Sequence, residues 1–367
     1  MIKPPDYISD IKPYIPGKPI EELERELGIK GSIKLASNEN PVGPSRMALK
    51  AIIESLQACK PASLLNRYPD GSGYYIKKAL AERLSVREDE IILGNGSNEL
   101  IDIAVRTFLQ RGDEAVMAYP SFVIYPMAVQ AIGGRPIQVS LKDYTHDLDA
   151  MVDAVTSKTK MLFIANPNNP TGTINKRDEF DRMMNRLPDG ILIVVDEAYY
   201  EYVTDPDYAD SIKHFRAGRD ILILRTFSKI YGLAALRIGY GIARQDIILE
   251  MNKLRPPFNT NSIAQKAALW AMEDEEHVKY SREINEQGKK YLYGELNSIG
   301  LRYVPTEANF IYMHLGQDSQ VLYNELLRQG VIVRPVGPEE IRVTIGLPEE
   351  NKRFIEALKK SLVNSHW

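Results

Sequence analysis

The sequence predicts an α/β fold in which helices sandwich a mainly parallel sheet and a smaller α+β domain follows. Three observations predict it. Short apolar segments alternate with helical patterns up to about residue 260. Runs such as ILIVV and ILIL are apolar at every position, as expected of strands buried on both faces of a parallel sheet. After about residue 261 the alternation stops and a long charged helical region begins.

The elements can be assigned in chain order. The first 45 residues are rich in proline and turn residues, with one short amphipathic helix at residues 20–27 that Gly28 ends. The strands expected for the sheet are residues 91–93, 114–118, 161–165, 191–195, 221–224 and 238–242. The helices expected between them include residues 98–109, 122–132 and 177–186. The later region is expected to contain a helical stretch at 262–296, strands near 309–314, 331–334 and 341–345, and a last helix.

This order predicts three parts: an N-terminal arm at residues 1–45 that helps to form the small domain, a large domain at 46–260 and a small domain at 261–367. The net charge is −3, so we expect neither nucleic acid nor an anionic membrane as a partner. The single cysteine, Cys59, excludes intramolecular disulfides and cysteine-built metal sites. The five histidines follow no metal-ligand spacing, so no metal is expected. No signal peptide or spanning segment is recognisable, and a cytoplasmic location is expected.

Polar groups follow four of the expected strands, and ligands of open parallel sheets bind at such carboxyl ends. After residues 91–93 comes GNGSNE, a glycine-rich turn that opens a helix and suits an anion. The alternative is a simple capped helix start. After residues 161–165 comes NPNNPTG, in which two prolines and a glycine make a rigid turn that fixes Asn169. The alternative is an ordinary loop.

The next two strand ends carry charged groups. Asp196 closes an apolar strand, which is costly unless the carboxylate meets a partner; the alternative is a helix cap. Lys229 follows two hydroxyl residues and precedes Arg237 by eight positions, a set that suits a phosphate beside a reactive amine. The alternative for Lys229 alone is a solvated lysine. A lysine, an aspartate, a phosphate loop and an arginine are together what pyridoxal 5′-phosphate (PLP) needs.

The ordered motifs NPNNPTG, DEAY and TFSKIYGLAALRIGY resemble those of the fold type I PLP-dependent aminotransferases, over nearly the whole chain. The resemblance implies that Lys229 forms the Schiff base and shuttles the proton, and that Asp196 pairs with the pyridine nitrogen. It implies that Asn169 and Tyr199 hydrogen-bond the ring's phenolic oxygen, and that Phe122 stacks on the ring. The residues implied to bind the cofactor phosphate are Gly96, Ser97, Asn98, Thr226, Ser228 and Arg237. Ala235 departs from the usual AGLR motif, and its methyl group should be tolerated.

Further segments are similar to those of histidinol-phosphate aminotransferases, among them PGKP, LASNENPVGPS, NRYPDG, GVIVRPV and IRVTIG. That family implies a homodimer with shared active sites, to whose interface the N-terminal arm contributes. Tyr68 would reach the partner subunit's cofactor phosphate, and Tyr14 would cover the substrate of a neighbouring subunit. The residues implied to contact the substrate are Arg342, Arg334, Arg353 and, more weakly, Asn309 and Asn40. The alternatives are a sheet-edge salt bridge for Arg342, a solvated surface role for Arg353, and packing for the two tyrosines.

The implied reaction is ping-pong transamination between L-histidinol phosphate with 2-oxoglutarate and imidazole acetol phosphate with L-glutamate, in histidine biosynthesis. Three other functions stay open. An aromatic-amino-acid aminotransferase would share nearly every motif, and a threonine-phosphate decarboxylase would share the cofactor set. A non-catalytic PLP-binding protein is the third, although the proline-rich first 45 residues do not suit the DNA-binding domain of such regulators.

Overall fold

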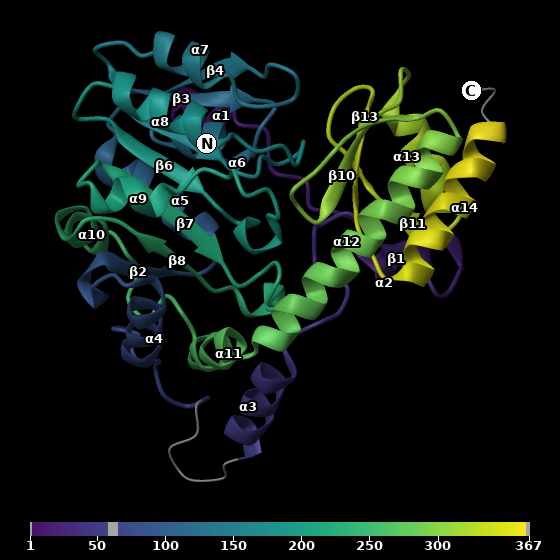
Figure 1. The fold of residues 1–367 in the computed structure, drawn as a ribbon, viewed down its shortest axis with the longest axis horizontal. Helices are drawn as coiled ribbons and strands as arrows, with labels where there is room; N and C mark the ends of the chain where they lie inside the picture. Colours follow the sequence, from purple (N-terminus) through teal and green to yellow (C-terminus); the bar gives the residue numbers. More distant parts are fainter. Residues whose placement is uncertain (1, 58–64, 365–367) are drawn as a thin grey trace.

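A computed structural model describes residues 2–57 and 65–364, so that Cys59 and His366 lie outside the described residues. Its largest feature is a seven-stranded sheet with the order β2-β8-β7-β6-β5-β3-β4 (Figure 1). The strands are β2 (Ile91–Gly94), β3 (Glu114–Tyr119), β4 (Arg135–Ser140), β5 (Thr159–Ala165), β6 (Leu192–Asp196), β7 (Ile221–Thr226) and β8 (Gly239–Ile242). Only β8 runs antiparallel to its neighbours. The predicted parallel α/β fold is therefore confirmed.

One strand of this sheet, β4, was not predicted from the sequence and lies at the edge. It pairs with β3 alone, and each of its six residues is exposed or half-buried. The sequence RPIQVS therefore lacks the continuous apolar run by which the central strands were recognised. A half-buried edge strand gives a weaker sequence signal than a buried one.

Helices cover both faces of the large sheet. Within β3, Ala115 and Met117 belong to one core and Val116 to the other, because successive side chains of a strand alternate between the faces. One face carries α5 (Ser97–Phe108), α6 (Ile124–Ala131) and α10 (Gln245–Asn252). The other carries α3 (Arg46–Gln57), α4 (Tyr74–Leu84), α7 (Leu148–Asp153), α8 (Arg177–Arg186), α9 (Ser211–Arg216) and α11 (Ser262–Glu273).

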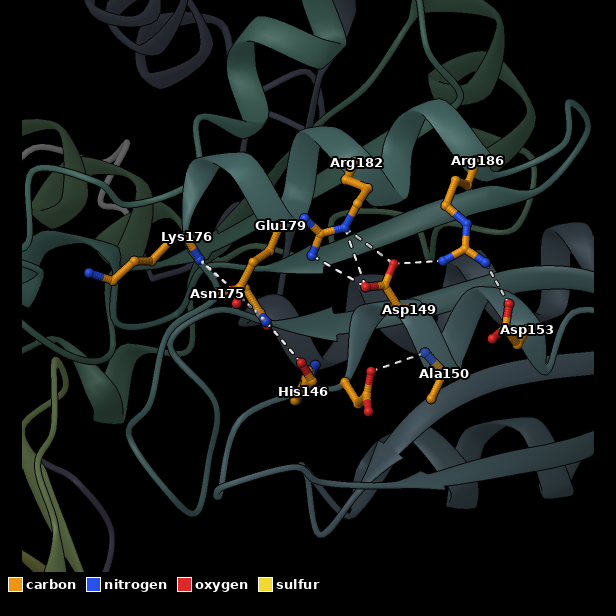
Figure 2. Close-up of polar contacts among 10 residues, drawn as sticks. His146, Asp149, Ala150, Asp153, Asn175, Lys176, Glu179, Arg182 and Arg186 are labelled. Atoms are coloured by element: carbon orange, nitrogen blue, oxygen red, sulfur yellow. Dashed lines mark hydrogen bonds and ion pairs between the residues drawn. The ribbon is translucent and has the colours of Figure 1, made fainter.

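Helices α7 and α8 are joined on the surface and beneath it (Figure 2). At the surface Asp149 accepts from Arg182 and Arg186, and such exposed ion pairs contribute little to stability. Below them the Asn175 side chain donates to the His146 carbonyl at 2.9 Å, and both residues are buried. Nε2 of the His146 ring lies 3.0 Å from Asn168 Oδ1. His146 therefore connects the buried Asn175 side chain to the NPNNPTG loop.

A second body lies beside the large sheet (Figure 1). It has a four-stranded sheet of order β12-β13-β10-β9 and a two-stranded sheet of β1 and β11. Its elements are β1 (Ile33–Lys34), α12 (Glu275–Ser298), β9 (Arg302–Val304), β10 (Phe310–His314), α13 (Ser319–Arg328), β11 (Val331–Ile332), β12 (Arg334–Pro335), β13 (Glu340–Thr344) and α14 (Pro348–Asn364). The strand expected near 331–334 is thus divided between two sheets.

The N-terminal arm contacts both bodies. Helix α1 (Asp6–Ser9) lies against α6 of the large body, while β1 pairs in parallel with β11 of the small one. Helix α2 (Ile20–Leu27) buries Leu23 in a cluster with Ile332. The segment between α1 and α2, which contains Tyr14, therefore passes between the two bodies.

The helical stretch expected at 262–296 is two helices, α11 and α12, which Asp274 separates. The Asp274 side chain accepts from the His277 amide at 3.1 Å and caps α12. Helix α11 packs on α3 and α4 and adds Ala264 and Ala267 to a core of the large sheet. We therefore propose that the small domain begins at α12 rather than at residue 261.

Candidate active site

One cavity lies where the carboxyl ends of β5, β6 and β7 meet the start of α5, and β13 and the N-terminal arm border its other side. It gathers most of the residues that the sequence predicts for a site. Those that line it are Tyr14, Gly96, Ser97, Asn98, Phe122, Asn169, Asp196, Tyr199, Thr226, Ser228, Lys229, Arg237 and Arg342.

Lys229 follows β7 and is the amine of the cavity. Its Nζ donates to the Ser37 carbonyl at 3.3 Å and lies 5.5 Å from the centroid of the Tyr199 ring. Burial lowers the pKa of Lys229 to about 8, and the nearby Arg342 guanidinium acts in the same direction. A larger fraction of this amine is therefore neutral, and so nucleophilic, near pH 7 than for an exposed lysine.

Asp196 closes β6 and faces the same cavity. Its Oδ2 accepts from the Tyr125 hydroxyl at 2.9 Å and its Oδ1 from the Ala198 amide at 3.1 Å. Burial raises the pKa of Asp196 to about 6, while these two hydrogen bonds and Lys229 oppose the rise. The carboxylate begins no helix, and its surroundings suit it to pair with a cation inside the cavity.

Gly96, Ser97 and Asn98 at the start of α5, together with Arg237, form what we call the anion cradle. Gly96 is the N-terminal cap of this twelve-residue helix, with φ of 76°. A Cβ placed at Gly96 would lie 2.6 Å from Nη2 of Arg237, so only glycine lets the guanidinium approach the helix end. Arg237 also donates to Ser228 Oγ at 3.4 Å. Free helix N–H groups, hydroxyls and a guanidinium together fit a phosphate group.

Asn169 and Tyr199 each accept one hydrogen bond from a fixed donor. Nη1 of Arg342 donates to Asn169 Oδ1, and Nδ2 of Asn38 donates to the Tyr199 hydroxyl at 2.8 Å. Burial raises the pKa of Tyr199, and Arg342 and Asn38 oppose that rise. The remaining N–H groups of Asn169 and the O–H of Tyr199 are thus the donors that these two residues can offer to a ligand.

Arg342 lies on β13, between β12 and β10 in the small sheet. Its Nη2 donates to the Ala36 carbonyl at 2.7 Å, whereas its Nε is buried without a hydrogen-bond partner. Among the described residues no carboxylate lies within 4 Å of this guanidinium, so a sheet-edge salt bridge does not account for it. A buried, partly unpaired guanidinium in a cavity suits an anionic ligand.

Comparisons with known proteins agree with this geometry. A family model for aminotransferases of class I and II matches residues 30–358. The histidinol-phosphate aminotransferase of Moorella thermoacetica is 49% identical over 360 residues, covering 97% of this chain and 92% of the relative. The chain belongs to the histidinol-phosphate aminotransferase family.

Two further members show how far the similarity to this family extends. The relative named histidinol-phosphate aminotransferase 1 of Nitrosococcus oceani is 45% identical over 359 residues, covering 97% of this chain and 95% of its own. The crystal structure of the Sinorhizobium meliloti enzyme in complex with PLP superimposes with a TM-score of 0.91 at 26% identity, covering 100% of this chain and 99% of that one.

Several predicted site residues of this aminotransferase lie outside the cavity. Arg353 donates to the carbonyls of Gly31 and Gln329, so it joins α14 to neighbouring loops. Asn40 donates to the Ile230 carbonyl at 2.6 Å and to Ser281 Oγ at 2.9 Å. Asn309 donates to the Asn38 carbonyl at 3.1 Å and supports a cavity residue instead of lining the cavity itself.

Of three other predicted residues, Tyr14 lines the cavity and Arg334 and Tyr68 do not. Tyr14 lines the cavity of its own chain, whereas it was expected to come from a neighbouring subunit. Arg334 lies beside it, with its Cζ 5.3 Å from the centroid of the Tyr14 ring. Tyr68 is 82% exposed, lies away from the cavity of its own chain, and stacks on Phe258 at 4.7 Å between ring centroids.

Sequence reasoning missed Asn38, Ser37 and Tyr125 as cavity residues of this aminotransferase. Asn38 and Ser37 belong to the motif LASNENPVGPS, which indicated the family but assigned no function to either residue. Tyr125 comes three residues after Phe122, just inside α6, and that short spacing could have placed both at one site. Among the described residues no group of three acidic, histidine or cysteine side chains could hold a metal ion. Nor does that part of the chain include a helix that could cross a bilayer.

Proposed function

We propose that this aminotransferase uses PLP to transfer an amino group between L-histidinol phosphate with 2-oxoglutarate and imidazole acetol phosphate with L-glutamate, as a step of histidine biosynthesis. One observation carries the proposal: the Lys229 amine, the Asp196 carboxylate and the anion cradle at Gly96 open into the same cavity. The names of the relatives support the substrates, and the PLP complex of the Sinorhizobium meliloti enzyme supports the cofactor.

The residues of the cavity fit PLP group by group. The cradle of Gly96, Ser97, Asn98 and Arg237 would hold the phosphate, and the Lys229 amine would take up the aldehyde. Asp196 would pair with the ring nitrogen, and Asn169 and Tyr199 would donate to the phenolic oxygen. When bound, PLP supplies an electron sink for the electron pair left on the substrate's Cα.

The proton transfers fall to Lys229 and its surroundings. With a pKa of about 8, its amine can take a proton from Cα near neutral pH and release it again. Asp196 would hold a positive charge on the ring nitrogen, which favours the ionised carboxylate even though burial alone disfavours it. Tyr125 and Ala198 hold that carboxylate in one orientation through their hydrogen bonds.

One anion site would have to serve two different substrates. Glutamate brings carboxylates, whereas histidinol phosphate brings a phosphate and no carboxylate. Arg342 and Arg334 are paired across β13 and β12, and arginine binds either anion in bidentate fashion. Arg342 reaches into the cavity and Arg334 lies against Tyr14, so an anion between them would also contact the N-terminal arm.

We also propose a homodimer, with Tyr68 contributed to the active site of the partner subunit. Exposed apolar side chains on the two helices that flank Tyr68 in the sequence are consistent with a surface that a partner subunit covers. Leu49, Ile53 and Leu56 form an exposed stripe on α3, and Tyr75 is 74% exposed on α4. A cytoplasmic location is part of the same proposal, in keeping with the place of such a reaction in amino-acid synthesis.

A single-turnover half-reaction tests the substrate. The PLP form is mixed with L-histidinol phosphate, and conversion of the visible cofactor band to the near-ultraviolet pyridoxamine band is followed. Phenylalanine, tyrosine and threonine phosphate are run in parallel. Fast conversion with histidinol phosphate and slow conversion with the others is expected. Faster conversion with phenylalanine or tyrosine would instead indicate an aromatic-amino-acid aminotransferase. If none of the four compounds converted the bound cofactor, the proposal would be contradicted.

A further inference from the structure

Asn38 occupies an unusual backbone position at the junction of the arm and the two bodies. It is 1% exposed and has a left-handed φ of 56°, which asparagine, aspartate and glycine tolerate best. Thr344 of β13 and Asn309 fix it: its amide donates to Thr344 Oγ1 at 2.9 Å, and its carbonyl accepts from Asn309 at 3.1 Å. Its side chain reaches Tyr199.

The hydrogen bonds around Asn38 favour one orientation of its side-chain amide. Thr344 Oγ1 accepts from the Asn38 backbone N–H at 2.9 Å, and its own proton can go to Asn38 Oδ1, 3.2 Å away. In this orientation Nδ2 faces the Tyr199 oxygen at 2.8 Å; with the amide turned over, Thr344 Oγ1 would accept two hydrogen bonds and its buried hydroxyl proton would lose this acceptor. Asn38 is therefore a donor to Tyr199 and not an acceptor from it.

This direction decides where the proton of Tyr199 can go. A phenol has one O–H to donate, and it cannot donate to an N–H group. Tyr199 lines the cavity, and the two carboxylates that precede it already accept from other groups: Asp196 from Tyr125 and Ala198, and Glu197 from Arg225. We propose that Asn38 is a positioning residue that turns the Tyr199 hydroxyl proton into the cavity, toward the phenolic oxygen of the cofactor. This inference rests on the proposed use of PLP.

The orientation of the Asn169 side-chain amide is fixed in a similar way. Arg342 can only donate, so Asn169 must turn its oxygen toward Arg342 and its N–H groups elsewhere. Arg342 and Thr344 are two residues apart on β13 and therefore lie on the same face of that strand. One strand of the small domain thus directs both donors, Asn169 directly and Tyr199 through Asn38.

Several charged groups face Tyr199 and must be separated from the effect of Asn38. Arg342 lowers the pKa of Tyr199 and Asp196 raises it, while the Lys229 amine lies 5.5 Å from its ring centroid. The buried Tyr202 is a further titratable neighbour. Substitutions at Asn38 that introduce no charge leave all of these groups in place, so they isolate the hydrogen bond.

The test is a pH titration of the visible band of the bound cofactor in four holoenzymes: wild type, Asn38→Gly, Tyr199→Phe and the double variant. Glycine suits the left-handed backbone and removes only the side chain. A donor to the phenolic oxygen favours its ionised form, so losing that donor should raise the titration midpoint by about one pH unit. We expect Asn38→Gly to raise the midpoint in the wild-type background and to leave it unchanged in the Tyr199→Phe background.

Asn38→Asp is a second variant, in which a carboxylate accepts where the amide donates and also adds a negative charge beside Tyr199. Tyr199 would then donate to residue 38, and the midpoint should rise further than in Asn38→Gly. Equal shifts of Asn38→Gly with and without Tyr199, or no shift at all, would overturn the positioning role while leaving PLP chemistry intact. A wild-type protein that forms no visible band with PLP would overturn the proposed function itself, and this inference with it.

Discussion

At the scale of single residues, burial of the Lys229 amine carries a cost to stability. The pKa of Lys229 is about 8 in the folded chain, against 10.5 for a lysine that is fully exposed to water, as in the unfolded chain. Below pH 8 the folded state therefore holds a poorly solvated positive charge. That cost is full below pH 8, declines between pH 8 and 10.5, and vanishes above, because the unfolded chain then also releases the proton.

We therefore expect Lys229→Met to abolish turnover and to stabilise the cofactor-free protein at pH 7 by as much as about 3 kcal/mol. The gain should be much smaller at pH 10. Urea unfolding of both cofactor-free proteins at the two pH values measures it. Lys290→Met, at an exposed lysine, is the control and should stay within about 0.5 kcal/mol of wild type. Identical stabilities of wild type and Lys229→Met at pH 7 would show that the buried charge costs nothing.

Most residues of the large body that the sequence located share one property: they lie at or just after the ends of strands. Asp196 and Lys229 could be found because polar groups stand out after apolar runs. Asn38 could not, because its role depends on Thr344 and Tyr199, which are distant in sequence. The family resemblance implied an anion contact for Arg353, but its contacts with backbone carbonyls depend on how α14 packs, which no local pattern encodes.

At the scale of elements, the start of α5 is the most sensitive part of the site. Gly96→Ala would force an L-residue into a backbone conformation that suits only glycine and would push its Cβ against Arg237. We expect PLP to bind about ten- to a hundredfold more weakly, as measured by equilibrium titration of the cofactor-free protein.

Gly294→Ala is the matched control for this substitution. Gly294 is exposed within α12, about one turn before its C-terminal end, and a Cβ there meets no atom within 4 Å. This variant should bind PLP as wild type does and gain up to about 1 kcal/mol of stability from its higher helix propensity. If both glycine variants bound PLP equally well, the cradle would not be the phosphate site.

The elements that the sequence predicted are those with strong local signals. Helices α2 and α8 have the predicted limits, and the six predicted strands of the large sheet are all present. The edge strands β4 and β9 were missed because few of their residues are buried. The break at Asp274 was missed as well, since the charged pattern continues across it and only packing distinguishes α11 from α12.

At the scale of the whole molecule, the cavity lies on the seam between the two bodies. The large body supplies Lys229, Asp196 and the anion cradle, whereas the small body supplies Arg342. The two bodies also meet at the NPNNPTG loop, where the Glu307 amide donates to the Gly172 carbonyl at 2.8 Å. Movement of the small body would therefore displace Arg342 and the loop that carries Asn169 together.

The position of Tyr68 determines whether a partner subunit is needed to complete the site. Tyr68 is exposed and does not line the cavity of its own chain, so any role in cofactor binding requires a partner subunit. Mixing Lys229→Ala chains with Tyr68→Phe chains tests this. In a heterodimer with exchanged tyrosines, the Tyr68→Phe chain keeps Lys229 and receives an intact Tyr68 from its partner, which gives one complete site.

We expect such mixtures to recover up to about half of the wild-type activity per heterodimer, whereas each variant alone is impaired. In the heterodimer, one active site carries both the Lys229→Ala and the Tyr68→Phe substitutions, whereas the other active site carries neither. Activity is measured after the two variants are unfolded, mixed and refolded, with each variant refolded alone as the control. If Tyr68 served its own chain, every site in the heterodimer would carry one defect, and mixing would restore nothing.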